Sequence, residues 1–504
     1  MGDLGDILTA LDVYGVKERP AELGSFNVES LSVQYDFTRE ELADALRALS
    51  PAADPLDPVK TVMHETTHLF HLLTTPFGFL VYALRRMQAM LVRDMITELR
   101  FAHGLKIRYP LVQWARELPE EASEAIYPNL FLWYESELFI LFALDGIKSW
   151  EQQIVRNPLL RSISPSVLFA DIQYAIAAFY RLHARQAAIA SGISFEEAAL
   201  PFADYVADEL PADAMSDAFL MLVQTLHDDL NMIFITESAG TIAESWGSQS
   251  TDGTEVWRRF QATFNKRGLG NMVGTKILDG PLNASNTSEF VQSYLALCDL
   301  SLFGPVLPQY RALRHGPVDL WELVPFLRWW RLVTLAREVE PMHSLDDYGR
   351  YTDELCERLG WVSPRTITQT TAAQHIGVPE DFQEATFVAA TQWRASAPGI
   401  FQNYGWVLQG DDAAHAAFQS EFHFPVIQYR DRTVYLKDTE RLLSLTREYL
   451  VRAALRAAFL RDKMAVRMPY RPKDPKEVAF LRETLVGDLA EIIGIRIGDL
   501  ELTC

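Results

Sequence analysis

Apolar residues recur through most of this chain at a spacing close to 3.6 residues, which is the period of an α-helix. Alternation of apolar and polar residues, which is typical of a half-buried strand, is rare. We therefore expect a mainly α fold. The helices that this spacing predicts cover residues 38–49, 57–73, 77–102, 131–156, 165–191, 213–246, 286–300, 319–338 and 439–463.

Strands are predicted in only two regions. Ser30 to Phe37 shows a weak alternation. The segments His423 to Tyr429 and Thr433 to Lys437 have strand character, and a short polar turn separates them. The sequence thus predicts a minor β-hairpin near the C-terminus of a large helical body.

No internal repeat or low-complexity tract divides the chain. Residues typical of loops gather at 50–55, 247–253 and 469–475, and none of these loops is long enough to be a disordered linker. We predict a helical body over residues 1–370 and a mixed C-terminal region over residues 371–504. A single domain is the alternative.

Composition limits the classes of partner. The chain has 504 residues, of which 49% are hydrophobic, and a formal net charge of −21. Nucleic acids and anionic membranes carry the same sign of charge, so neither is an expected partner. A peptide or a small molecule is the expected substrate, and the oligomeric state stays open.

The expected location is the cytoplasm. The three cysteines are too few and too scattered for a disulfide framework or a zinc ribbon. The N-terminus lacks the basic start and apolar core of a signal peptide. No uninterrupted apolar run reaches about 18 residues, the length that spans a bilayer.

The most informative motif is His64-Glu65-Thr66-Thr67-His68, which has the form HExxH. On a helix the two histidines project from the same face and can share one metal ion. Glu65 can then take a proton from a water molecule that the metal activates. The alternative is a core helix whose histidines make ordinary hydrogen bonds.

The sequence around the motif predicts a short buried helix. Asp57-Pro58 is typical of an N-cap followed by proline at the first helical position. Apolar residues flank the motif, and Thr74-Thr75-Pro76 with Gly78 ends the helix. Buried histidines need partners, and a metal ion is one of them.

A catalytic zinc usually takes three protein ligands, so a third must lie elsewhere in the chain. Glu237 and Glu244 share one face of an otherwise apolar helical segment, 235–246, whose small residues allow another helix to approach closely. Acidic residues in such a setting are costly unless they are paired or bound to metal. Solvated surface glutamates are the alternative. Asp94 and Glu98 compete for the third position, but neighbouring arginines favour surface ion pairs for them.

These two segments resemble the all-helical zinc peptidases that include thimet oligopeptidase, carboxypeptidase Taq and angiotensin-converting enzyme. His64 to His71 fits the HExxHxxH form of the oligopeptidases, and Glu237, Glu244 and Trp246 repeat the spacing around their ligand glutamate. Two features differ. Thr67 replaces the glycine inside the family's motif, and Glu237 follows His68 by far more residues than the family's roughly two dozen.

The resemblance implies roles for these residues. His64, His68 and Glu237 would be the zinc ligands, Glu65 the general base, and Glu244 a partner that fixes the tautomer of a ligand histidine. His71 lies on the same helix face as His64 and is a candidate for a fourth metal contact, a substrate-binding donor or, as we expect, a satisfied core histidine.

In that family tyrosines stabilise the oxyanion. Tyr348, Tyr351 and Tyr404 are candidates. A carboxylate near the histidines could also come from His227-Asp228-Asp229, although a solvated helix turn is the better-supported interpretation of that segment.

The sequence therefore predicts a zinc-dependent hydrolase, most simply a metallopeptidase. Two alternatives remain. Two histidines and one carboxylate also suit Fe²⁺ and oxygen chemistry in an enzyme that is not a peptidase. A non-catalytic helical binding protein would carry the motif by coincidence and hold no metal.

Overall fold

The computed structural model describes the following parts of the chain. They are residues 24–27, 32–48, 57–133, 136–137, 140, 192–194, 197, 232–244, 284–285, 287–304, 322, 325–374, 382–396, 426–431, 434–435, 439–460, 464–468, 475–494 and 500–503.

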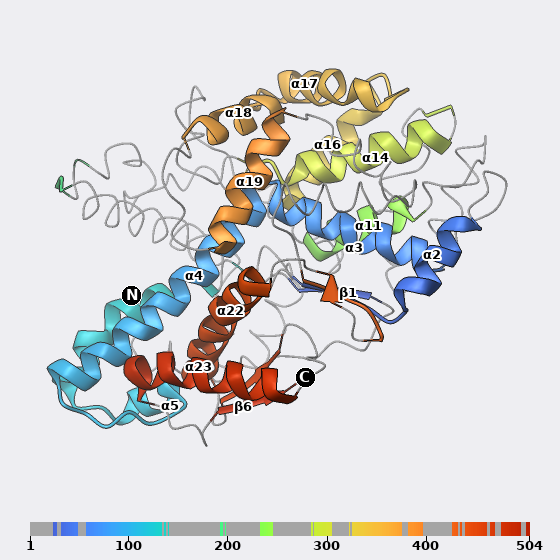
Figure 1. Cartoon of the computed structure of the whole chain (residues 1–504). Helices are drawn as coiled ribbons and strands as arrows, with labels where there is room; N and C mark the ends of the chain where they lie inside the picture. The colour runs from blue at the N-terminus through green and yellow to red at the C-terminus, as the bar shows by residue number, and fades with distance from the viewer. Residues whose placement is uncertain are drawn as a thin grey trace.

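Most of the described residues are helical, which confirms the mainly α prediction (Figure 1). The α-helices are α2 (Arg39–Arg47), α3 (Asp57–Leu73), α4 (Pro76–Thr97), α5 (Leu111–Trp114), α11 (Met232–Ala243), α14 (Thr287–Ser301), α16 (Pro325–Ala336), α17 (Tyr348–Leu359), α18 (Pro364–Gln374), α19 (Phe382–Ser396), α22 (Thr439–Leu460) and α23 (Pro475–Ile493).

Helix α3 carries the HExxH motif and lies at the centre of the helical body. It packs against α11, α2, α4 and α19. Residues 62–67 are buried without a break, so α3 has no solvent-exposed stripe along this stretch. A helix that is buried on every side is a core helix, as the flanking apolar residues predicted. In Figure 1, α14, α16, α17 and α18 lie above α3, and α4 runs away from it toward α5 and α23.

The break between α3 and α4 follows the predicted stop signal. Helix α3 ends at Leu73, and Pro76 is the first residue of α4. Thr75 caps α4, because its hydroxyl accepts a hydrogen bond from the Gly78 backbone at 3.3 Å. A Cβ at Gly78 would lie 1.7 Å from the Leu72 carbonyl oxygen, so only glycine allows this close turn.

Two small sheets complete the described fold. The first has the order β1-β2-β3-β4, with β1 (Gly24–Asn27), β2 (Ser32–Tyr35), β3 (Val426–Gln428) and β4 (Val434–Tyr435). Strands β3 and β4 pair antiparallel, which confirms the predicted hairpin. The second sheet pairs β5 (Met464–Arg467) with β6 (Leu500–Thr503) in parallel. Neither of these strands had been predicted from the sequence.

The first sheet joins distant parts of the sequence. Strand β2 pairs with β3 in parallel, and Val33 is opposite Ile427. Strand β1 packs on α3, so this sheet covers one side of the HExxH helix. Residues from both predicted regions thus share one sheet, and the proposed division at residue 370 stays a prediction.

Several predicted helices differ at their ends or lie partly outside the described residues. Residues 120–133 are helical, so that helix begins earlier than predicted. The prediction over 213–246 is described only from Met232 onward, and 165–191 lies outside the described residues. Helices α17, α18, α19 and α23 had not been predicted.

Among the described residues, no individual helix has the length and apolar composition of a membrane span. One pair of helices, Asp57–Leu73 and Pro76–Ala102, reaches the required length and composition together, and it is bent by 74°.

Candidate metal centre

The helix α3 brings the two motif histidines together. His64 and His68 are one turn apart, and their ring centroids lie 4.6 Å from each other with the ring planes at 87°. Thr67, which replaces the family's glycine, is fully buried and donates a hydrogen bond from its hydroxyl to the Met63 carbonyl oxygen at 2.7 Å. The larger side chain therefore fits within the helix packing.

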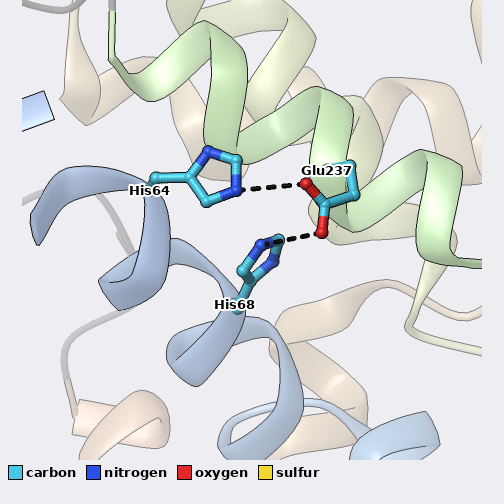
Figure 2. Close-up of side chains that lie close together, drawn as sticks. All are labelled: His64, His68 and Glu237. Carbon is cyan, nitrogen blue, oxygen red and sulfur yellow. Dashed lines mark hydrogen bonds and ion pairs between the residues drawn. The ribbon is translucent and has the colours of Figure 1, made fainter. Parts of the chain in front are cut away.

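Glu237 on α11 faces both imidazoles (Figure 2). His64 Nε2 lies 3.2 Å from one carboxylate oxygen of Glu237, and His68 Nε2 lies 3.4 Å from the other. One ligand atom from each of these three side chains falls within 4.8 Å of the others. The structure thus brings together the residues that the sequence suggested as ligands.

Glu244 lies at the other nitrogen of His64. Its Oε1 is 2.9 Å from His64 Nδ1. An imidazole whose Nδ1 faces a carboxylate is favoured in the tautomer that leaves Nε2 available to a metal ion. Glu244 thus lies where the resemblance implies a partner for a ligand histidine.

The electrostatics of this cluster favour a cation. Burial disfavours a charged His64, but the adjacent carboxylates of Glu237 and Glu244 outweigh burial and raise the His64 pKa to about 10. For Glu237, burial raises the pKa, but the charge of His68 and the hydrogen bonds of both histidines lower it far below the ordinary value. The two carboxylates thus favour a proton on His64, and a metal ion would compete with that proton for the imidazole.

Two imidazole nitrogens and one carboxylate oxygen form a donor set that suits zinc. A four-coordinate zinc ion held by three protein donors would keep its fourth position for water or substrate. On donor chemistry, His64, His68 and Glu237 therefore fit the ion that the sequence predicted, and Fe²⁺ suits the same set.

Helix α11 reaches the histidines because it has no side chain at Gly240. A Cβ at this position would lie 2.6 Å from His64 Nδ1. Its neighbours Ser238, Ala239 and Ala243 are small and fully buried. The small residues noted in the sequence thus allow α11 to approach α3 as closely as the three donors require.

Glu65 lies under the first sheet. Its side chain is only 4% exposed, and it is close enough to the Tyr35 hydroxyl on β2 to affect its ionisation. The Tyr35 ring centroid lies 5.7 Å from that of Tyr429. Sequence reasoning missed both tyrosines, and the only signal for Tyr35 was the weak alternation of its strand.

His71 is buried in the core, but it is not the satisfied core histidine that we expected. Its Nε2 lies 4.0 Å from Asp299 Oδ1 on α14, and neither ring nitrogen has a hydrogen-bond partner among the described residues. Burial lowers its pKa to about 4, so the ring is neutral at pH 7. His71 thus faces Asp299, and Glu237 is not among the groups that affect its ionisation.

Asp299 belongs to a buried network that the sequence did not reveal. Arg394 on α19 bonds to both oxygens of Asp299 and donates to the Thr74 hydroxyl at 2.8 Å. The Tyr348 hydroxyl also bonds to Asp299. Tyr348, one candidate for oxyanion stabilisation, is therefore engaged in this network, and Tyr351 is buried nearby in the same helix.

The competing carboxylates lie elsewhere. Asp94 is about half exposed and pairs with Arg93, while Glu98 is similarly exposed and lies 3.7 Å from His103. The Asp94–Arg93 contact is the kind of surface ion pair that the neighbouring arginines favoured, whereas Glu98 meets a histidine. His227-Asp228-Asp229 and Tyr404 lie outside the described residues.

Comparisons of the chain with models of known protein families, with curated proteins and with solved structures find no match.

Proposed function

We propose that this protein is a zinc-dependent hydrolase and, within that class, a metallopeptidase. The observation that carries the proposal is the convergence of His64 and His68 on α3 with Glu237 on α11. One buried and one partly exposed histidine, with a carboxylate from a distant segment, form a donor set with the composition of a catalytic zinc site. The resemblance to the helical zinc peptidases supports the same assignment.

The residues have distinct roles in this proposal. His64, His68 and Glu237 hold the ion, and Glu244 keeps the His64 ring in the tautomer that presents Nε2. A zinc ion at this position supplies Lewis acidity to a carbonyl group and lowers the pKa of water.

Glu65 is the general base. Its carboxylate takes one proton from the attacking water, whose oxygen bonds to the carbonyl carbon. Glu65 then gives that proton to the leaving amine as the carbon–nitrogen bond breaks, so the side chain ends the cycle as a carboxylate again. Burial of Glu65 at 4% exposure keeps bulk water from competing for the proton.

The test starts with protein purified without added metal. Metal content by mass spectrometry is followed by cleavage of a mixed peptide library with the zinc-loaded protein. We expect about one zinc per chain, and cleavage that 1,10-phenanthroline abolishes. Iron in place of zinc, without peptide cleavage, would favour oxygen chemistry, and the absence of any metal would leave a helical binding protein.

The matched variant is Glu65→Gln, which keeps the shape of the side chain but cannot accept the proton. We expect zinc to stay bound and the turnover of peptides to fall about 10²- to 10⁴-fold. Loss of zinc together with activity in this variant would contradict the role given to Glu65.

A further inference from the structure

Arg394 on α19 is a charged side chain that is buried where several helices meet. It is 2% exposed, and it forms hydrogen bonds to both oxygens of Asp299 on α14. Its terminal nitrogens also donate to the Thr74 hydroxyl at 2.8 Å and to the Tyr348 hydroxyl at 2.9 Å. A buried guanidinium is costly unless its donors are satisfied, so these hydrogen bonds hold its partners in fixed places.

One of these hydrogen bonds reaches the helix that carries the motif histidines. Thr74 directly follows α3, and its hydroxyl donates to the Phe70 carbonyl oxygen in the last turn of α3 at 2.7 Å. The Phe77 backbone, at the start of α4, donates to the Leu302 carbonyl oxygen, just after α14, at 3.3 Å. The guanidinium and this backbone hydrogen bond thus join the end of α3 to the end of α14.

Helix α14 also supports the helix that carries Glu237. Cys298 directly precedes Asp299 in α14, and its sulfur lies 3.8 Å from the hydroxyl of Ser238, the residue after Glu237 on α11. Cys298 and Ser238 are both fully buried, so α11 and α14 cannot shift here without disturbing the packing. Two neighbouring residues of α14 thus support both parts of the chain that carry the metal donors, α11 directly and α3 through Arg394.

We propose that Arg394 is a positioning residue for the metal centre, which sets the distance of Glu237 from His64 and His68 by tying α14 to the end of α3. The inference rests on the proposed function, in which these three side chains hold zinc. Metal donors need to lie within about 0.5 Å of their productive positions, so a small shift of α11 against α3 weakens binding. Arg394 contacts neither the metal nor its ligands in this proposal. It acts only through the helices that it joins.

The experiment uses the full-length protein loaded with Co²⁺, whose visible absorption reports the geometry of its ligands. Arg394→Lys keeps a positive charge near Asp299, but a single ammonium cannot hold Asp299 and Thr74 together as the guanidinium does. We expect this variant to shift the cobalt absorption bands and to bind zinc about tenfold more weakly than wild type. If the variant is less stable to urea but keeps the cobalt spectrum and zinc affinity of wild type, Arg394 only stabilises the fold and the proposal is wrong.

Thr74→Val is a milder variant that tests the same tie even if Arg394→Lys does not fold. It removes the hydroxyl that joins the guanidinium to α3, with little change of volume. The matched control is Thr446→Val on α22, where the lost hydroxyl is also buried and has no hydrogen-bond partner among the described residues. We expect a shift of the cobalt bands and an about threefold lower zinc affinity in Thr74→Val, and neither change in the control. Equal changes in both threonine variants, or none in Thr74→Val, would overturn the proposal.

Crystal structures of metal-free wild type, Arg394→Lys and Thr74→Val give a readout that needs neither zinc nor substrate. We expect His68 Nε2 and the Glu237 carboxylate, which lie 3.4 Å apart, to separate by about 0.5 Å or more in the variants. An unchanged separation contradicts the inference. If wild type binds no metal ion, the proposed function fails, and this separation still decides whether Arg394 positions Glu237 against the histidines.

Discussion

Two glutamates lie between helices of this protein, Glu137 buried and Glu237 partly exposed, and different cations balance their charges. Glu137 meets guanidinium groups, because Arg85 on α4 and Arg456 on α22 both bond to it, and Gln88 adds a hydrogen bond at 2.8 Å. Glu237 meets imidazoles, those of His64 and His68. Both glutamates have pKa values below the ordinary range despite burial.

The two clusters differ in whether the cationic side chain can exchange its proton for a metal ion. A guanidinium stays charged at every accessible pH and has only donors, so it cannot become a metal ligand. An imidazole can lose its proton and present the same nitrogen to a metal ion. The Glu137 cluster is thus a permanent tie between helices, whereas the Glu237 cluster has the chemistry of a site where metal replaces a proton.

The largest expected effect concerns the Glu137 cluster. Glu137→Ala leaves two buried or half-buried guanidinium groups without their carboxylate, so the free energy of unfolding should fall by about 3–5 kcal/mol. Urea denaturation measures the loss. Zinc stoichiometry of the folded protein should not change, and a variant that loses zinc while folded would show that the two clusters are not independent.

Close packing at the imidazole cluster gives the next effect. Gly240→Ala forces a Cβ to within 2.6 Å of His64 Nδ1 unless α11 moves. We expect a cost of about 1–3 kcal/mol in unfolding free energy and weaker zinc binding. The control is Gly487→Ala on α23, where a Cβ meets nothing within 4 Å. This control should keep its zinc affinity and gain about 0.5–1 kcal/mol in stability, because alanine is the better helix former.

A smaller effect is expected where a carboxylate acts through an imidazole. Glu244→Gln removes the charge that faces His64 Nδ1, and we expect zinc affinity to fall about 10- to 100-fold. Competition with a chromophoric chelator measures the affinity. Glu98→Gln is the surface control and should bind zinc like wild type. Equal losses in both variants would argue against a specific role for Glu244.

The smallest expected effect is the pH dependence of the stability that the Glu137 cluster contributes. Burial opposes ionisation of Glu137, but Arg85 and Arg456 hold its pKa below the ordinary value of 4.5. The stabilisation is therefore complete above pH 4.5 and is lost as the pH falls through the lower pKa of the folded state. The stability difference between wild type and Glu137→Gln should be constant above about pH 5 and shrink in more acidic solution. A difference that grows on acidification would contradict this assignment.

The local parts of the fold could be predicted from the sequence, because their signals are contiguous. The α3 helix begins at Asp57 and ends at Leu73, as the Asp-Pro start and the Thr-Thr-Pro stop indicated. The β3–β4 hairpin has the same local character. Helices α18 and α19 were missed because threonine, alanine and glutamine weaken their apolar period.

The candidate site was predictable where burial and charge conflict. Glu237 was singled out because a carboxylate in an apolar helix needs a partner, and the structure places it against both histidines. The positions of Tyr35 and Asp299 were missed because they depend on contacts between distant segments, and no spacing within the sequence reports such contacts.

The most direct test of whether the Glu237 cluster binds metal is the zinc content of three purified proteins, measured by mass spectrometry. They are wild type, Glu237→Ala and, as the matched buried glutamate, the folded fraction of Glu137→Ala. We expect about one zinc per chain in wild type and in Glu137→Ala, and none in Glu237→Ala. Zinc that stays bound in Glu237→Ala, or that is absent from wild type after reconstitution, would contradict the assignment of this cluster as a metal centre.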